Sequence, residues 1–115
     1  MSRDDAYLLD MLIAARRAET HAAATTEEQF YASPLHQDAI VRALEIVGEA
    51  ARFVSAGTRA QHPAIEWDKI IGMRHRLAHD YRNIDLDIVW SVATREISPL
   101  IGYLERIVPP DEPET

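Results

Sequence analysis

The chain has 115 residues, 47% of them hydrophobic, and a formal net charge of −7 at pH 7, so one acidic domain with one hydrophobic core is expected. It contains no cysteine, which excludes disulfides, thiolate metal sites and a cysteine nucleophile. No apolar run approaches the roughly 20 residues that span a bilayer, and the acidic N-terminus does not resemble a signal peptide, so a cytoplasmic protein without a membrane segment is expected.

Two helical segments are predicted before the central helix. Apolar residues recur at three- and four-residue spacing over residues 4–24, which predicts the first helix. Residues 25–29 contain a capping-box pattern, in which a threonine precedes Glu28 or Gln29 by three positions. This pattern predicts a short helical segment that extends through about Tyr31.

The central helix has a clear start signal, because Ser33 is a capping residue and proline follows it at the first helical position. The helix is expected to run to about Ser55 and to end at Gly57. It carries two apolar stripes, so two neighbours are expected: the intrachain core and a candidate subunit interface. Its small residues, Gly48 among them, permit another backbone to approach closely. The stripes are Ile40, Leu44, Val47, Ala51 and Val54, and Ile46, Ala50 and Phe53.

A loop and then another helix are expected after the central helix. Residues 58–63 are predicted to be the loop, and the helix that follows carries residues 73–82. Residues 83–87 are predicted to be a break, in which Asp85 caps the next helix.

The last helix is predicted over residues 86–108, and Pro99 is expected to kink or split it near Ile97. Residues 109–115 form an acidic, proline-rich tail that is predicted to be disordered. The fold class is therefore all-α. We expect a single domain, residues 1–108, folded as an up-and-down bundle of four or five helices.

A cationic island stands out in this acidic chain. Between Lys69 and Arg82 the chain has one lysine, three arginines and one aspartate, so this window carries +3 with histidine neutral, whereas the whole chain carries −7. A local excess of positive charge on an acidic protein indicates a site for a phosphate or another anion.

Arg74 occupies an unusual position in this island. At 100° per residue it falls inside the apolar arc that Ile70, Leu77 and Tyr81 form on one helix. Arginine is rarely buried without a partner. Arg74 therefore needs a carboxylate, a neighbouring subunit or a bound anion, whereas Tyr81 by itself indicates a core aromatic residue.

Arg74 and His79 are suited to phosphate chemistry, since arginine can hold a phosphate and histidine can transfer protons near neutral pH. Together they would serve metal-independent cleavage of RNA, with the neighbouring 2′-OH as the nucleophile. About 140° separates them on one helix, so they converge only if the helix frays after His79 or if a second copy contributes. The alternative is a structural Arg74 paired with Glu45 or Glu49, and a surface histidine.

His75 and His79 are four residues apart, which is a spacing that metal ligands use on a helix. The zinc-protease pattern needs a glutamate directly after the first histidine, and here Arg76 occupies that position. The neighbouring arginines also oppose a cation, so no metal site is expected.

His79 follows Arg74 after four intervening residues, and Tyr81 follows His79 after one. This spacing resembles the signature of the HEPN superfamily. More narrowly, the chain is similar to the HepT toxins of the HepT–MntA toxin–antitoxin systems. Residues 43–51 in the central helix and the segments on both sides of the motif resemble the corresponding sequence segments of that family. The resemblance covers about residues 5–108 and keeps the order of these segments.

The resemblance implies a HEPN-type helical homodimer in which the two motifs face one another. It implies a type VII toxin, a metal-independent endoribonuclease without a cofactor, whose catalytic pair is Arg74 and His79. It also implies that an MntA-like minimal nucleotidyltransferase antitoxin transfers AMP to Tyr81, because phosphates added there would exclude RNA. His75 stands where the family commonly has asparagine, and His75 and Arg76 are expected to be supporting residues.

A different class of function remains open. The chain could be a non-catalytic helical adaptor that only docks a nucleotidyltransferase partner. This alternative predicts partner binding without loss of cellular RNA.

Overall fold

The computed structural model describes residues 1–109, except for the side chain of Tyr81, and no strand occurs among them. The all-α class is therefore confirmed. Most of the predicted tail lies outside the described residues, which end at Pro109. In chain order the helices are α1 (Arg3–Ala23), α2 (Glu27–Ala32), α3 (Pro34–Phe53), α4 (Ala56–Gln61), α5 (Trp67–His79), the 3₁₀ helix η1 (Tyr81–Asn83), α6 (Leu86–Ser91), the π-helix η2 (Val92–Glu96) and α7 (Ile97–Ile107).

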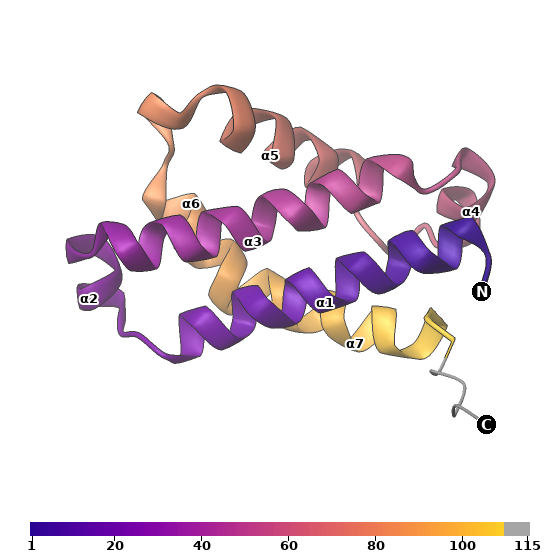
Figure 1. The fold of residues 1–115 in the computed structure, drawn as a ribbon, viewed down its shortest axis with the longest axis horizontal. Coiled ribbons are helices and arrows are strands. Elements are labelled where there is room, and N and C mark those ends of the chain that lie inside the picture. Colours follow the sequence, from indigo (N-terminus) through magenta and orange to yellow (C-terminus); the bar gives the residue numbers. More distant parts are fainter. Residues whose placement is uncertain (110–115) are drawn as a thin grey trace.

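The long helices alternate in direction, as the sequence predicted for an up-and-down bundle. α1 packs against α3 and α7, and α5 packs mainly against α3 (Figure 1). The N-terminus and the end of α7 lie at the same end of the bundle, whereas α5 ends at the opposite end, near α6 (Figure 1). The motif helix is thus an outer helix whose main neighbour is α3.

Local capping signals start the first three helices where the sequence predicted them. The side chain of Ser2 accepts a hydrogen bond from the N–H of Asp5 at 3.0 Å and closes a capping box. Thr26 and Gln29 form a second capping box at the start of α2. The side chain of Ser33 caps α3, with proline at the first helical position. Each cap satisfies N–H groups that the first helical turn would leave unpaired.

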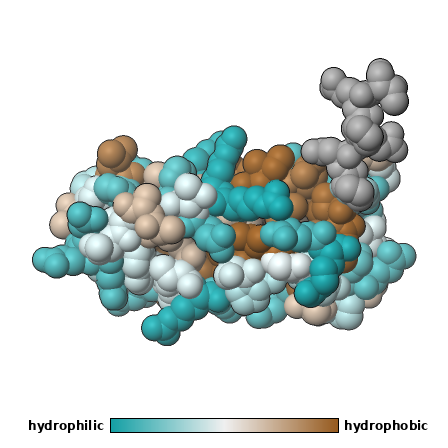
Figure 2. All heavy atoms as spheres, turned by 90° about the horizontal axis from the view of Figure 1, so that it is seen from below, coloured by the Kyte–Doolittle hydropathy of each residue, from teal (hydrophilic) through white to brown (hydrophobic). Residues whose placement is uncertain are grey.

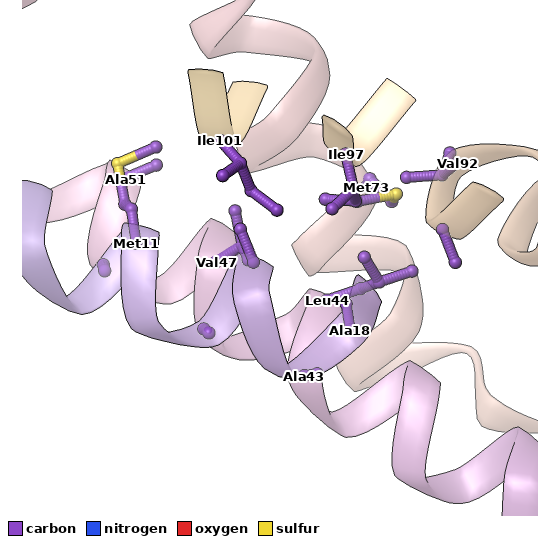
Figure 3. Packing of buried hydrophobic residues seen from close by; sticks show 14 of the residues in the cluster. Met11, Ala18, Ala43, Leu44, Val47, Ala51, Met73, Val92, Ile97 and Ile101 are labelled. Carbon is purple, nitrogen blue, oxygen red and sulfur yellow. The ribbon is translucent and has the colours of Figure 1, made fainter. Parts of the chain in front are cut away.

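The hydrophobic core lies between α1, α3, α5 and the last helical stretch (Figure 3). All five residues of the first apolar stripe of α3 are buried, and Leu44 is completely inaccessible. Burying a side chain of that size stabilises the fold by about 1.5–3 kcal/mol. The second stripe is less buried, since Ile46 is half-buried and Phe53 is exposed and stacked on Tyr7.

The predicted end of the central helix and the predicted loop after it are wrong. α3 ends at Phe53, and a short helix, α4, follows where a loop was expected. Val54 has an extended backbone, and the side chain of Ser55 then accepts a hydrogen bond from the N–H of Thr58 at 3.4 Å. This second cap restarts the helix, so Gly57 lies inside α4.

The start of α4 is tied to the start of α1 by Asp4. Its carboxylate accepts hydrogen bonds from the N–H of Ser55 at 3.0 Å, from the hydroxyl of Ser55 at 2.6 Å and from the hydroxyl of Thr58 at 2.5 Å. The hydroxyl of Ser55 is the main cause that holds the pKa of Asp4 below its ordinary value of 3.8. These bonds exist only in the folded state and favour the charged form of the Asp4 carboxylate. They therefore stabilise the fold at pH values above the ordinary pKa. This stabilisation is lost as the pH falls through the lowered pKa.

We therefore expect Asp4→Asn to lower the Tm by a few degrees at pH 7, and the difference from the parent to shrink below about pH 4. Thermal unfolding followed by circular dichroism at both pH values measures this. Asp10→Asn is the matched control, because Asp10 is exposed on the same helix. An equal loss of Tm in both variants would contradict the assignment.

The last helical stretch is divided near Pro99, as the sequence predicted. Proline has no N–H for the preceding turn, and that turn is the π-helix η2, in which the N–H of Ile97 donates to the carbonyl of Val92. The wider turn carries Glu96, which forms an ion pair with Lys69 of α5. The hydrogen bond to Glu96 raises the pKa of Lys69. This pair links η2 to the first half of α5.

Candidate functional site

The register of α5 on the core is fixed by three apolar side chains. Trp67 is buried at the start of the helix, and its indole N–H donates to the carbonyl of His62 at 3.0 Å. Met73 and Leu77 are buried one turn apart farther along. Because residues four apart share a face, these contacts also determine which way the motif residues between them point.

α5 ends at His79, three residues before the end that the sequence predicted. Asp80 leaves the helical region, with φ −124° and ψ 44°. Its carboxylate accepts a hydrogen bond from the side-chain amide of Asn83 at 3.1 Å, and its carbonyl accepts one from the N–H of Asn83 at 3.0 Å. Aspartate and asparagine compete with a helix through such local bonds, and the chain continues as η1.

Arg74 is packed directly against the backbone of α3 at Gly48. A Cβ atom added to Gly48 would lie 2.2 Å from Cβ of Arg74 and 2.9 Å from the carbonyl oxygen of Ile70. Only glycine fits at this crossing. The sequence predicted close approach of another backbone here, and within this chain that backbone is α5.

The guanidinium group of Arg74 pairs with Glu49, the residue after Gly48. The Nε atom of Arg74 lies 2.8 Å from Oε2 of Glu49, and the Arg74 side chain is 22% exposed. The sequence required a partner for Arg74 and named two candidate carboxylates. The partner is Glu49, whereas Glu45 pairs with Arg42 at 3.4 Å. The buried Oε2 atom accepts no hydrogen bond, so the short contact with Arg74 is an ion pair without hydrogen-bond alignment.

The two histidines of the motif form an exposed pair on α5. The ring centroids of His75 and His79 lie 4.7 Å apart. The helix is intact from Arg74 to His79, so about 140° separates these two residues around its axis. The helix ends at His79, as the route by fraying required, but this end does not change the angle between the two residues.

Part of the cationic island is neutralised by carboxylates of other helices, since Lys69 and Arg74 both have acidic partners. The side chain of Arg76 is exposed and has no hydrogen-bond or ion-pair partner among the described residues. It borders a crevice of about 130 Å³ between α5, η1 and α6, which Met73, Leu77 and Asp80 also line. The side chain of Arg76 is thus open to an anion.

Tyr81 is the first residue of η1, directly beyond the end of α5. Its side chain lies outside the described part of the structure, so neither a core position nor an exposed hydroxyl is assigned to it.

The sequence of this chain is similar to known proteins over most of its length. The family described as ribonuclease HepT-like matches residues 11–107. The chain belongs to the HepT-like ribonuclease family. A relative from Thermococcus cleftensis, named "Probable ribonuclease HepT", is 32% identical over 88% of this chain and 92% of its own length. One from Methanocaldococcus jannaschii, named "Putative RNase", is 30% identical over 93% of this chain and 100% of its own length. No solved structure matched significantly.

An apolar cavity of this HepT-like chain lies away from the motif histidines. It has a volume of about 330 Å³ and is lined mainly by apolar side chains of α3, α5, η2 and α7, with Lys69 and Glu96 among the polar ones. Figure 2 shows a hydrophobic area on the underside of the molecule that hydrophilic side chains cross. Neither Arg74 nor His79 lines this cavity.

Within residues 1–109, no group of three or more histidine, aspartate or glutamate side chains converges on a point where a metal ion could be held. No helix in the same part of the chain is both long enough and apolar enough to cross a membrane.

The motif residues can be identified from the sequence, but the contacts that hold Arg74 cannot. Glu49 was only one of two candidate partners, since both glutamates lie on the same helix edge. The small residue beside it, Gly48, was the signal that identifies the contact, because a side chain there would clash with Arg74 and with the backbone of α5.

Proposed function

We propose that this HepT-like chain is a metal-independent endoribonuclease in which Arg74 binds the RNA phosphate and His79 transfers protons. The observation that carries the proposal is the state of Arg74. Its Nε atom lies 2.8 Å from Glu49, and its two terminal nitrogens donate no hydrogen bond among the described residues. This fork can bind two oxygens of one phosphate.

The chemistry requires only these side chains and the RNA. The 2′-oxygen forms a bond to phosphorus and the bond from phosphorus to the 5′-oxygen breaks, leaving a 2′,3′-cyclic phosphate and a 5′-hydroxyl. One proton leaves the 2′-OH and one reaches the 5′-oxygen, and a histidine such as His79 is suited to these transfers. Arg74 stabilises the charge that develops on the phosphate.

The active form in this proposal is a homodimer. Arg74 and His79 point in directions about 140° apart on an intact helix, so one chain does not direct both at one phosphate. A two-fold axis near α5 would bring His79 of one copy towards Arg74 of the other. Closed two-fold dimers are the commonest oligomers.

A direct test incubates the purified protein with total cellular RNA in the presence of excess EDTA. Cleavage to products with 2′,3′-cyclic phosphate ends is expected, because no step uses a metal ion. Products that carry 3′-hydroxyl ends, or cleavage that stops with EDTA, would contradict the proposed reaction.

The biological role in this proposal is that of a type VII toxin acting in the cytoplasm. The partner is an MntA-like nucleotidyltransferase antitoxin that transfers AMP from ATP to Tyr81. Tyr81 lies two residues from His79, so phosphates attached there would repel an RNA phosphate from the site.

We therefore expect co-expression with such a nucleotidyltransferase to add the mass of AMP to a peptide that contains Tyr81. Tyr81→Phe should remove this addition and restore toxicity in the presence of the partner. Mass spectrometry of the purified complex measures both. Tyr31→Phe is the control, since Tyr31 lies on α2 and donates to Asp87 instead, a bond that raises its pKa to about 12.

A second candidate function is a non-catalytic adaptor that docks the nucleotidyltransferase. The Glu49 pair favours it, because an arginine with a carboxylate partner can be purely structural. If the chain is an adaptor, its Arg74→Ala variant should bind the partner as well as the parent does, and the parent should leave cellular RNA intact.

A further inference from the structure

We infer that Glu49 is a positioning residue that holds the guanidinium group of Arg74 in the orientation in which it binds the scissile phosphate. The inference rests on the proposed ribonuclease function and assigns a role to a side chain outside the motif.

The side chain of Arg74 is fixed at two points. Its stem lies against Gly48, where even one added methyl carbon would come within 2.2 Å of Cβ of Arg74. Its Nε atom lies 2.8 Å from the carboxylate of Glu49. Because Gly48 and Glu49 are consecutive on α3, one rigid helix holds both ends of the side chain.

Because Glu49 contacts Nε, the edge of the guanidinium group that carries the two terminal nitrogens is available for a phosphate. An arginine paired through both terminal nitrogens would have its fork occupied by the carboxylate. Here Nε contacts the carboxylate at 2.8 Å, and the terminal nitrogens donate no hydrogen bond among the described residues, so their N–H groups can bind a phosphate.

The carboxylate of Glu49 is itself held from the other side. Its Oε1 atom lies 3.4 Å from Nε of Arg52 on α3, while Oε2 is buried, accepts no hydrogen bond and faces Arg74. A buried carboxylate oxygen without a hydrogen bond is costly for stability. A functional role, such as positioning Arg74, is one of the explanations for a buried polar atom of this kind.

The test compares Glu49→Gln with the matched control Glu45→Gln. Both residues lie on α3, but Glu45 pairs with Arg42 rather than with Arg74. The probe is a single-stranded RNA of mixed sequence with a fluorophore and a quencher at its ends. We expect Glu49→Gln to lower kcat by about 10- to 100-fold, because a displacement of about 1 Å can have such an effect. Glu45→Gln should keep the parental kcat.

The binding readout separates positioning from a structural role. Removing the carboxylate leaves the positive charge of Arg74 uncompensated. KM should therefore stay unchanged or fall, and so should the Kd for a fully 2′-O-methylated version of the same RNA. A kcat within threefold of the parent would overturn the inference. A lower kcat with weaker RNA binding would overturn it as well, because loss of the local fold explains that pattern.

Failure of this inference can be distinguished from failure of the proposed function. If Arg74→Ala and His79→Ala cleave the probe as fast as the parent, the ribonuclease proposal itself fails. If these two variants are inactive and Glu49→Gln is fully active, only the positioning role fails.

Discussion

Replacing His79 with alanine should abolish RNA cleavage and relieve the growth arrest that the unpartnered chain causes. Loss of a side chain that transfers protons in the transition state typically lowers the rate by about 10²–10⁴-fold. The fold should be unaffected, since His79 is exposed at the last position of α5 and its described contact is with the ring of His75. Surface changes of this kind alter the free energy of unfolding by about 0.5 kcal/mol or less.

His75→Ala is the matched comparison for this prediction, because His75 is exposed one turn earlier on the same helix. We expect the cleavage rate of His75→Ala to be at least about tenfold higher than that of His79→Ala. Growth curves after induction and gel analysis of total RNA measure both effects. A His79→Ala protein as toxic as the parent would show that the catalytic assignment is wrong.

Gly48→Ala should damage both stability and activity. The added carbon would meet Cβ of Arg74 at 2.2 Å and a backbone oxygen at 2.9 Å, and a backbone cannot rotate away as a flexible side chain does. α5 must therefore move away from α3. Overpacking of this kind typically costs about 1–3 kcal/mol, which corresponds to a fall in Tm of roughly 5–15 °C. Cleavage should fall as well, because Arg74 moves with α5.

Gly72→Ala is the control for this second prediction. Gly72 also lies in a helix, α5, but an added Cβ there meets nothing within 4 Å. Alanine favours helix more than glycine does, so Gly72→Ala should raise stability by about 0.4–1 kcal/mol. Thermal unfolding and the RNA assay report on both variants. If Gly48→Ala were as stable and active as the parent, close packing of α5 on α3 would not hold Arg74.

The sequence predicted those parts of the fold that local signals determine. Ser33 followed by proline marked the start of α3, and Pro99 marked the division of the last helical stretch. The apolar stripe through Leu44 identified the core face. Each signal acts within a few residues, so no tertiary information was needed.

The parts that the sequence missed depend on contacts between distant residues or on competing local bonds. α4 was not predicted, since its cap, Ser55, is also bound by Asp4 from α1. The end of α5 at His79 depends on Asn83 bonding back to Asp80. The partner of Arg74 could not be chosen until the packing of α5 on Gly48 was known.

The central claim is that Arg74 of one copy works with His79 of the other. The most direct measurement mixes the inactive variants Arg74→Ala and His79→Ala, exchanges their subunits and assays RNA cleavage. In a mixed dimer, one of the two shared sites would contain both native side chains. Random exchange makes about half of the dimers mixed, so about a quarter of the parental activity should return. If the mixture stays inactive although mass spectrometry detects mixed dimers, the shared site is contradicted.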